Sequence, residues 1–185
     1  MLFRLQGWVL YLCVFWQVVI PVQAQGLPRR DELFAPLQES MTQARAERVE
    51  LLAPVSYARA SEALVELEKY FAGKAKADRL LKDQVAVQQA ISKTRQIAAQ
   101  SSKTLSSVIK AYDDALVAGA VQLQGEVWKK AEQRFQQAVA KVESDDLDSA
   151  RSKGAEAEVL LRDAELQAIK ASVLGVARDW ISKAQ

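Results

Sequence analysis

The chain has 185 residues, with 25 lysines and arginines against 23 aspartates and glutamates, and half of its residues are hydrophobic. Opposite charges are interspersed along the whole sequence, so no basic block is available to neutralise a phosphate backbone. We therefore expect no nucleic-acid partner. The chain also has no histidine and a single cysteine, Cys13, which limits the chemistry that it can support.

The first 24 residues have the pattern of a removable secretory signal peptide. Arg4 supplies a positive start, residues 7–20 form an apolar stretch, and Val22-Gln23-Ala24 offers small residues at a cleavage site. We expect residues 1–24 to be removed and residues 25–185 to form an exported α-helical envelope domain in the periplasm. A retained anchor is the alternative, because the apolar stretch is near the lower limit of about 17 residues for a membrane span. Retention would bring contact with the membrane.

The mature sequence is typical of an all-α protein. No proline occurs after Pro54, alanine is abundant, and no run alternates as a half-buried strand would. We expect an elongated bundle of long antiparallel helices. The first of these covers residues 31–52 and has one apolar face, and a later start at Pro36 is the alternative. That face consists of Phe34, Leu37, Met41 and Ala44.

Two later stretches share one apolar spacing of three, four, three and four residues, which predicts two buried helical seams. The first seam is Tyr57, Ala60, Leu64, Leu67 and Phe71, and the second is Trp128, Ala131, Phe135, Ala138 and Val142, 71 positions later. A turn-forming cluster follows each seam, at residues 72–74 and 144–146. The pattern predicts two tandem helical hairpins that arose by duplication, or else ordinary core stripes of one bundle.

Between the two seams, residues 75–118 are predicted to form one helix on the order of 65 Å long. Polar residues at Gln84, Thr94 and Ser101 interrupt its apolar seam, so we expect its middle to bend. The seam consists of Leu80, Val87, Ile91, Ala98, Leu105, Val108, Tyr112 and Ala115. A connector flanked by Gly119 and Gly125 then leads to a helix over residues 126–143.

The last helix is predicted to run to Ser182, capped by Ser144 or Asp145. Capping also explains a local acidic cluster, whose third and sixth positions lack the oxygen ligand and the glycine of a calcium loop. The cluster consists of Asp145, Asp146, Asp148 and Glu156.

Catalytic chemistry is not expected. Without histidine, and without cysteine after cleavage, the mature chain has no Ser-His-Asp triad, thiol nucleophile or imidazole-based zinc site. Ser107 and Lys110 match a Ser-x-x-Lys pattern, but the companion motifs and the mixed α/β scaffold of such enzymes are missing. We expect no enzyme, no cofactor and no metal.

Residues 52–60, Leu-Ala-Pro-Val-Ser-Tyr-Ala-Arg-Ala, are followed by Leu64 and Leu67. Together with the aromatic and alanine spacing from Trp128 and the run at 164–170, this segment resembles the alanine-rich helical periplasmic region of bacterial envelope proteins. The likeness covers roughly residues 52–175. In several relatives that region precedes an OmpA-like peptidoglycan-binding domain. No such domain occurs in this sequence, so the resemblance does not imply peptidoglycan binding.

The resemblance and the composition together suggest an exported, non-enzymatic α-helical scaffold, spacer or protein-interaction module of the bacterial cell envelope. Its helices would contact another envelope protein or a second copy of the chain. The alternative is a periplasmic carrier or chaperone whose amphipathic helices open to cover a lipid or an apolar polypeptide.

Overall fold

The computed structural model describes residues 28–73 and 75–184, and over these ranges the chain forms eight helices and no strand. The predicted all-α fold is therefore confirmed. The predicted signal, residues 1–24, lies outside the described residues. The helices are α1 (Arg30–Ala46), α2 (Val49–Leu52), α3 (Pro54–Ala72), α4 (Ala77–Thr104), α5 (Ser106–Val117), α6 (Ala120–Leu123), α7 (Gly125–Glu143) and α8 (Leu147–Ala184).

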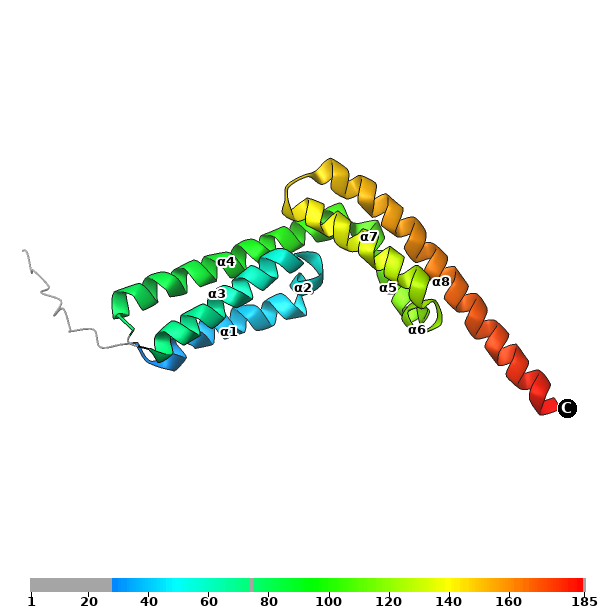
Figure 1. Ribbon diagram of the computed structural model, residues 1–185, viewed down its shortest axis with the longest axis horizontal. Helices are drawn as coiled ribbons and strands as arrows, with labels where there is room; N and C mark the ends of the chain where they lie inside the picture. Colours follow the sequence, from blue (N-terminus) through cyan, green and yellow to red (C-terminus); the bar gives the residue numbers. More distant parts are fainter. Residues whose placement is uncertain (1–27, 74, 185) are drawn as a thin grey trace, which may run out of the picture.

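The helices form an elongated molecule built from two three-helix units placed one after the other (Figure 1). In the first unit α1 and α3 pack along α4, and in the second unit α5 and α7 pack along α8. The short helices α2 and α6 turn the chain within each unit. The predicted hairpins are present as α3–α4 and α7–α8, and α7 also contacts α3 and α4 where the units meet.

The two units repeat one geometry with a period of 71 residues. Helices α3 and α7 have the same length of 19 residues, and α2 and α6 both have 4. Each short helix follows a left-handed residue, Arg48 with φ 58° and Gly119 with φ 78°. The buried face of α1 is likewise repeated 71 positions later, where Phe34, Leu37, Met41 and Ala44 correspond to Leu105, Val108, Tyr112 and Ala115.

The observed first helix starts earlier than the predicted one and also ends sooner. Helix α1 begins at Arg30 and includes Pro36, so the alternative of a later start was wrong. Proline removes one backbone donor and loosens the preceding turn. The Gln84 side chain of α4 donates a hydrogen bond to the Leu33 carbonyl in that turn at 2.9 Å. The left-handed Arg48 then separates α1 from α2, so residues 31–52 are not one helix.

The predicted long helix is also divided. Its bend lies at Leu105, beyond the middle where it was expected and at an apolar residue of the seam. The φ of −113° and ψ of 25° at Leu105 interrupt the helix between α4 and α5. The Leu105 N–H still donates to the Ser101 carbonyl, and the Leu105 carbonyl still accepts from Ile109, both at 2.9 Å. The chain therefore leaves the first unit as α4 and becomes the first helix of the second unit as α5, with one change of direction.

The start of α8 differs from the prediction in its cap. Asp146, rather than Ser144 or Asp145, accepts a hydrogen bond from the Ser149 N–H at 3.2 Å and caps the helix. Hydrogen bonds from Ser149 and from Lys141 hold the pKa of the Asp146 carboxyl below its ordinary value. Helix α8 continues to Ala184, two residues past the expected end.

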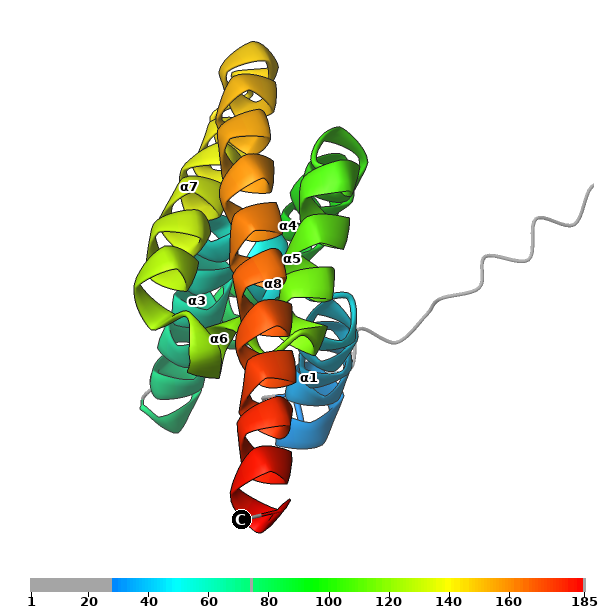
Figure 2. The ribbon, with the colours of Figure 1, turned by 90° about the vertical axis from the view of Figure 1, so that its right-hand side faces the viewer.

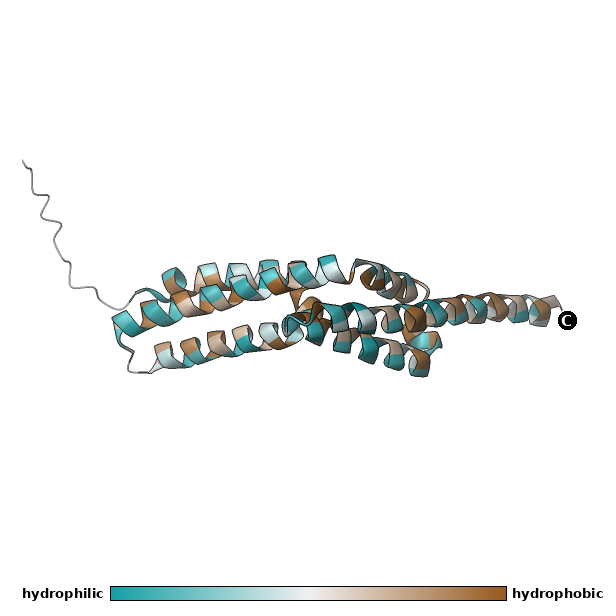
Figure 3. Ribbon diagram, turned by 90° about the horizontal axis from the view of Figure 1, so that it is seen from above, coloured by the Kyte–Doolittle hydropathy of each residue, from teal (hydrophilic) through white to brown (hydrophobic). Residues whose placement is uncertain are grey.

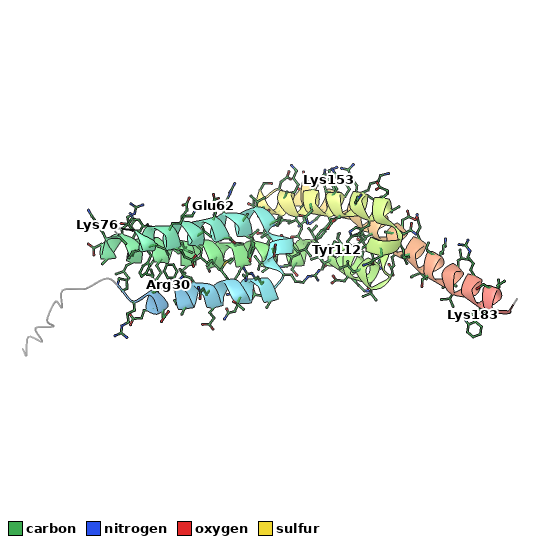
Figure 4. All side chains as sticks on the ribbon, turned by 60° about the horizontal axis from the view of Figure 1, so that its bottom comes forward. Arg30, Glu62, Lys76, Tyr112, Lys153 and Lys183 are labelled. Carbon is green, nitrogen blue, oxygen red and sulfur yellow. The ribbon has the colours of Figure 1, made fainter. Side chains whose placement is uncertain are left out.

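The predicted seams form part of the core. Of the ten seam residues, Leu64 and Phe71 are half-buried and the other eight are buried. Aromatic rings pack within each unit. Phe34 meets Phe71 edge-on with ring centres 5.5 Å apart, and Tyr112 lies 4.9 Å from Trp128 and 5.2 Å from Phe135. Figure 4 shows Tyr112 inside the second unit, while Arg30 and Lys183 lie at opposite ends of the molecule.

Candidate interaction surface

The seam residues predicted from the sequence hold the bundle together and are not available to a partner. The exposed apolar surface lies elsewhere, on the last part of α8. Ala168 is the last buried residue among those described. Beyond it, residues 169–184 continue as a single helix past the other helices (Figures 1 and 3). We call this segment the α8 overhang, and its 16 residues extend about 24 Å.

An apolar stripe runs along the overhang and begins just before it. Its members recur at intervals of three, four, three and four residues, which places them on one side of a helix. Their exposed fractions are 50% for Leu166, 46% for Ile169, 62% for Val173, 56% for Val176 and 74% for Trp180. We call these five residues the α8 stripe. Two further exposed residues, Leu174 and Ile181, make the overhang apolar on a second side.

A second exposed apolar group lies at the turn between α5 and α6, near the root of the overhang. Helix α6 packs against α8, and the Gln124 side chain that follows α6 donates to the Gln167 carbonyl of α8 at 3.4 Å. We call this group the α5–α6 corner. It consists of Leu116 (40% exposed), Val117 (90%), Val121 (41%) and Leu123 (46%).

The exposed apolar surface on α8 is large. The α8 stripe alone exposes roughly 500 Å², near the upper end of the largest apolar patch on a typical monomer. A helix that is apolar on several sides is normally covered by other protein. Among the described residues, no helix is both long enough and apolar enough to span a membrane.

Polar contacts connect the two units across their junction. The Glu143 carboxylate at the end of α7 accepts hydrogen bonds from the Val55 N–H at 3.3 Å and the Ser56 N–H at 2.7 Å. It thus caps α3 across the junction, where the helix leaves backbone donors unpaired. Arg48 forms an ion pair with Asp113 at 2.9 Å, and this contact raises the pKa of the Arg48 guanidinium.

Helices α5 and α8 approach closely inside the second unit. At Gly154 of α8, an added Cβ would lie 2.8 Å from Leu105 Cδ2 and 3.2 Å from Val108 Cγ2. About two turns further along α8, Arg162 bonds to the Asp114 carboxylate of α5 at 2.7 Å. Lys110 and Arg162 together hold the pKa of Asp114 below its ordinary value of 3.8.

The residues considered for chemistry in the sequence do not converge on a site. The Ser107 hydroxyl donates to Glu158 at 2.8 Å, whereas Lys110 bonds to Asp114 at 2.7 Å, so the lysine is not positioned on the serine. In the acidic cluster, Glu156 pairs with Lys153, and Asp148 pairs with Arg151. Over residues 28–73 and 75–184 no group of three or more acidic side chains is placed to hold a metal ion.

The surface hollows are shallow grooves between neighbouring helices. One of about 310 Å³ lies between α3 and α4 and is lined in part by Tyr70, Arg79 and Asp83. Arg79 stacks over the Tyr70 ring at 4.2 Å and pairs with Asp83 at 3.3 Å. Two of the three charged residues that line this groove, Arg79 and Asp83, are therefore already partnered within the protein, and the third is Glu66.

Sequence reasoning missed the α8 stripe as an exposed surface. Its spacing is the same as that of the buried seams, and it was visible in the sequence as a further apolar periodicity. The comparisons with known proteins do not identify it either, since no family model, no curated protein and no solved structure matches this chain.

Proposed function

We propose that this protein is an exported, non-enzymatic α-helical spacer and interaction module of the bacterial cell envelope. Its two units form a rod, and the α8 overhang binds an apolar helical partner, which is another envelope protein or a second copy of the chain. The observation that carries the proposal is the exposed α8 stripe, because a 3-4 apolar spacing on a helix favours packing against another helix.

The role as a spacer is supported by the way the units are joined. The chain passes from α4 into α5 with retained backbone hydrogen bonds on either side of Leu105. The cap from Glu143 and the ion pair between Arg48 and Asp113 connect other parts of the two units. Several independent contacts across one junction favour a fixed angle over free rotation, which suits a protein that holds partners at a set distance.

The envelope location is supported by the sequence of residues 1–24, with its positive start, apolar stretch and small residues before the cleavage site. The mass of the protein recovered from the periplasm tests this part of the proposal. The expected result is the mass of a chain that begins at residue 25. An intact Met1, or a protein found only in the cytoplasm, would contradict it.

In-cell photo-crosslinking tests the interaction role. A photoreactive phenylalanine analogue replaces Trp180 in the α8 stripe, and the matched control carries it at Val159, which is 70% exposed on the same helix but lies before the overhang. We expect a discrete crosslinked product from position 180 and none from position 159. Equal labelling at both positions, or no product at position 180, would contradict the proposal.

The carrier or chaperone alternative makes a different prediction. Opening the helices to cover a lipid or polypeptide would expose the buried α4 residues, such as Leu80, Val87 and Ile91. Hydrogen exchange of α4, measured with and without phospholipid vesicles or an unfolded apolar peptide, distinguishes the two roles. We expect unchanged exchange in α4, and a change confined to α4 on addition of either probe would favour the carrier role.

A further inference from the structure

We infer that the α8 overhangs of two copies of this chain pack against each other in antiparallel orientation, so that two rods join end to end. This inference rests on the proposed role of the overhang as an interaction element and specifies its partner. The partner's overhang would cover the α8 stripe, and its tip would reach the α5–α6 corner.

The stripe is suited to a copy of itself. Five apolar residues at alternating intervals of three and four form the seam that helices use when they pack side chains into each other's gaps at a shallow angle. A twofold interface needs a self-complementary surface. Two identical stripes satisfy that need, because each presents branched aliphatic side chains at the same spacing.

The area is sufficient for a specific dimer. Burying the stripe and part of the α5–α6 corner would remove roughly 600 Å² per copy, or about 1,200 Å² in total, which reaches the lower end for specific protein interfaces. Trp180, at the far end of the α8 stripe, is 74% exposed. Tryptophan is among the residues that most often dominate the binding energy of an interface.

The antiparallel direction follows from the position of α5. Arg162 lies on the same side of α8 as the stripe, one turn before Leu166, and it bonds to Asp114 of α5 at 2.7 Å. Helix α5 therefore flanks the stripe side of α8 just before the overhang begins. In a parallel dimer, two copies of α5 would need the space between the two α8 helices. In an antiparallel dimer the two bodies lie at opposite ends.

Charge favours one register of that dimer. When Ile169 faces the partner's Trp180 and Val173 faces the partner's Val176, Lys170 of each copy faces away from its counterpart. In the register displaced by one heptad, Ala171 would lie at the twofold axis and the two Lys170 side chains would lie close to each other, and like charges in an interface are unfavourable. In the favoured register the partner's Trp180 lies next to the root of the overhang, where the corner residues Val117 and Val121 are exposed.

The test uses the full chain and measures its mass by light scattering over a range of micromolar concentrations. We expect a monomer–dimer equilibrium. Val176→Glu should weaken the dimer by roughly thirty-fold or more, as expected for the loss of a central contact. The matched control Val159→Glu places the same charge on an exposed valine of α8 outside the interface, and it should change the dissociation constant by less than about three-fold.

Small-angle X-ray scattering on the same samples measures the direction of packing. An end-to-end antiparallel dimer has a maximum dimension well above that of the monomer, whereas a side-by-side dimer has nearly the same one. Trp180→Ala provides a second interface variant, and far-UV circular dichroism checks that each variant keeps its helices. The overhang contributes no buried residue to the core, so we expect all of them to fold.

Three results would overturn the inference: a monomer at every concentration, a dimer that Val176→Glu leaves intact, or a dimer no longer than the monomer. These outcomes are distinguishable from failure of the proposed function. A monomer whose position 180 still crosslinks to a different envelope protein keeps the interaction role and rejects self-association. A dimer of cytoplasmic protein would keep self-association and reject the envelope role.

Discussion

Gly154 provides a sharp test of how α8 packs in the second unit. It is buried in the middle of a long helix, where alanine would ordinarily be preferred by about 1 kcal/mol. A Cβ at this position would meet Leu105 at 2.8 Å and Val108 at 3.2 Å. Leu105 is only 1% exposed, so its side chain has little room to move away. Overpacking of this kind costs about 1–3 kcal/mol.

The two effects oppose each other for Gly154→Ala, and we expect a net loss of about 1 kcal/mol in the free energy of unfolding. Gly154→Val adds two more carbon atoms and a less favourable helix residue, so its loss should be about 3 kcal/mol or more. Gly175→Ala is the matched control in the same helix, because a Cβ there would have no neighbour within 4 Å. That change should not destabilise the protein.

Denaturant unfolding followed by far-UV circular dichroism measures these differences, with an unchanged dependence on denaturant concentration showing that the unfolded state is unaffected. The order Gly175→Ala, Gly154→Ala, Gly154→Val, from most to least stable, is the expected result. If alanine stabilises the protein as much at Gly154 as at Gly175, helices α5 and α8 are not as close as described and the reasoning is wrong.

Four further outcomes are expected. Glu143→Ala should cost about 0.5–2 kcal/mol in unfolding free energy, because α3 loses its cap. It should also broaden the distribution of angles between the units in X-ray scattering, and unchanged scattering would contradict the role of Glu143 in holding the two units together. Ser101→Ala should stabilise the protein by on the order of 1 kcal/mol in denaturant unfolding, since the buried Ser101 hydroxyl has no hydrogen-bond partner. Gly119→Ala should cost about 1–2 kcal/mol in the same assay, because φ is 78° there. The lowered pKa of Asp114 contributes stability above its unfolded value of 3.8 that is lost as pH falls through the folded pKa; Asp114→Asn should therefore flatten the acid limb of a pH titration of stability.

Much of the fold could be predicted because apolar spacing and the absence of proline specify helices directly. The seam that begins at Trp128 is buried as predicted, and the seam that begins at Tyr57 is buried except for Leu64 and Phe71, which are half-buried. The helix predicted over residues 126–143 begins one residue earlier, at Gly125. Burial of one side of each helix is the main constraint in a bundle, and a sequence records it as periodicity.

The breaks could not be predicted in the same way. Arg48 adopts a left-handed conformation without being glycine, and only its correspondence with Gly119, 71 positions later, marks it as a turn. Pro36 lies inside α1, and the Gln84 side chain from a distant helix donates to the Leu33 carbonyl in the turn before it. Both outcomes depend on tertiary contacts that no local pattern contains.

The candidate surface was harder to predict than the core for a related reason. The stripe from Leu166 to Trp180 has the same spacing as a buried seam, so periodicity alone does not distinguish a face that packs within the chain from one left exposed. The distinction arises because α8 is longer than α5 and α7, which lie beside it (Figure 2), so its last residues extend past both of them. Relative helix length, rather than composition, determines which residues remain uncovered.

The passage of the chain from α4 into α5 has a mechanical consequence. A tensile load applied along the rod would be carried across the junction by the covalent backbone of these two helices, and not by a non-covalent interface alone. Straightening the bend at Leu105 would need the Glu143 carboxylate to release the Val55 and Ser56 N–H groups of α3, which are only two hydrogen bonds. The protein should therefore yield elastically by a small extension before it unfolds.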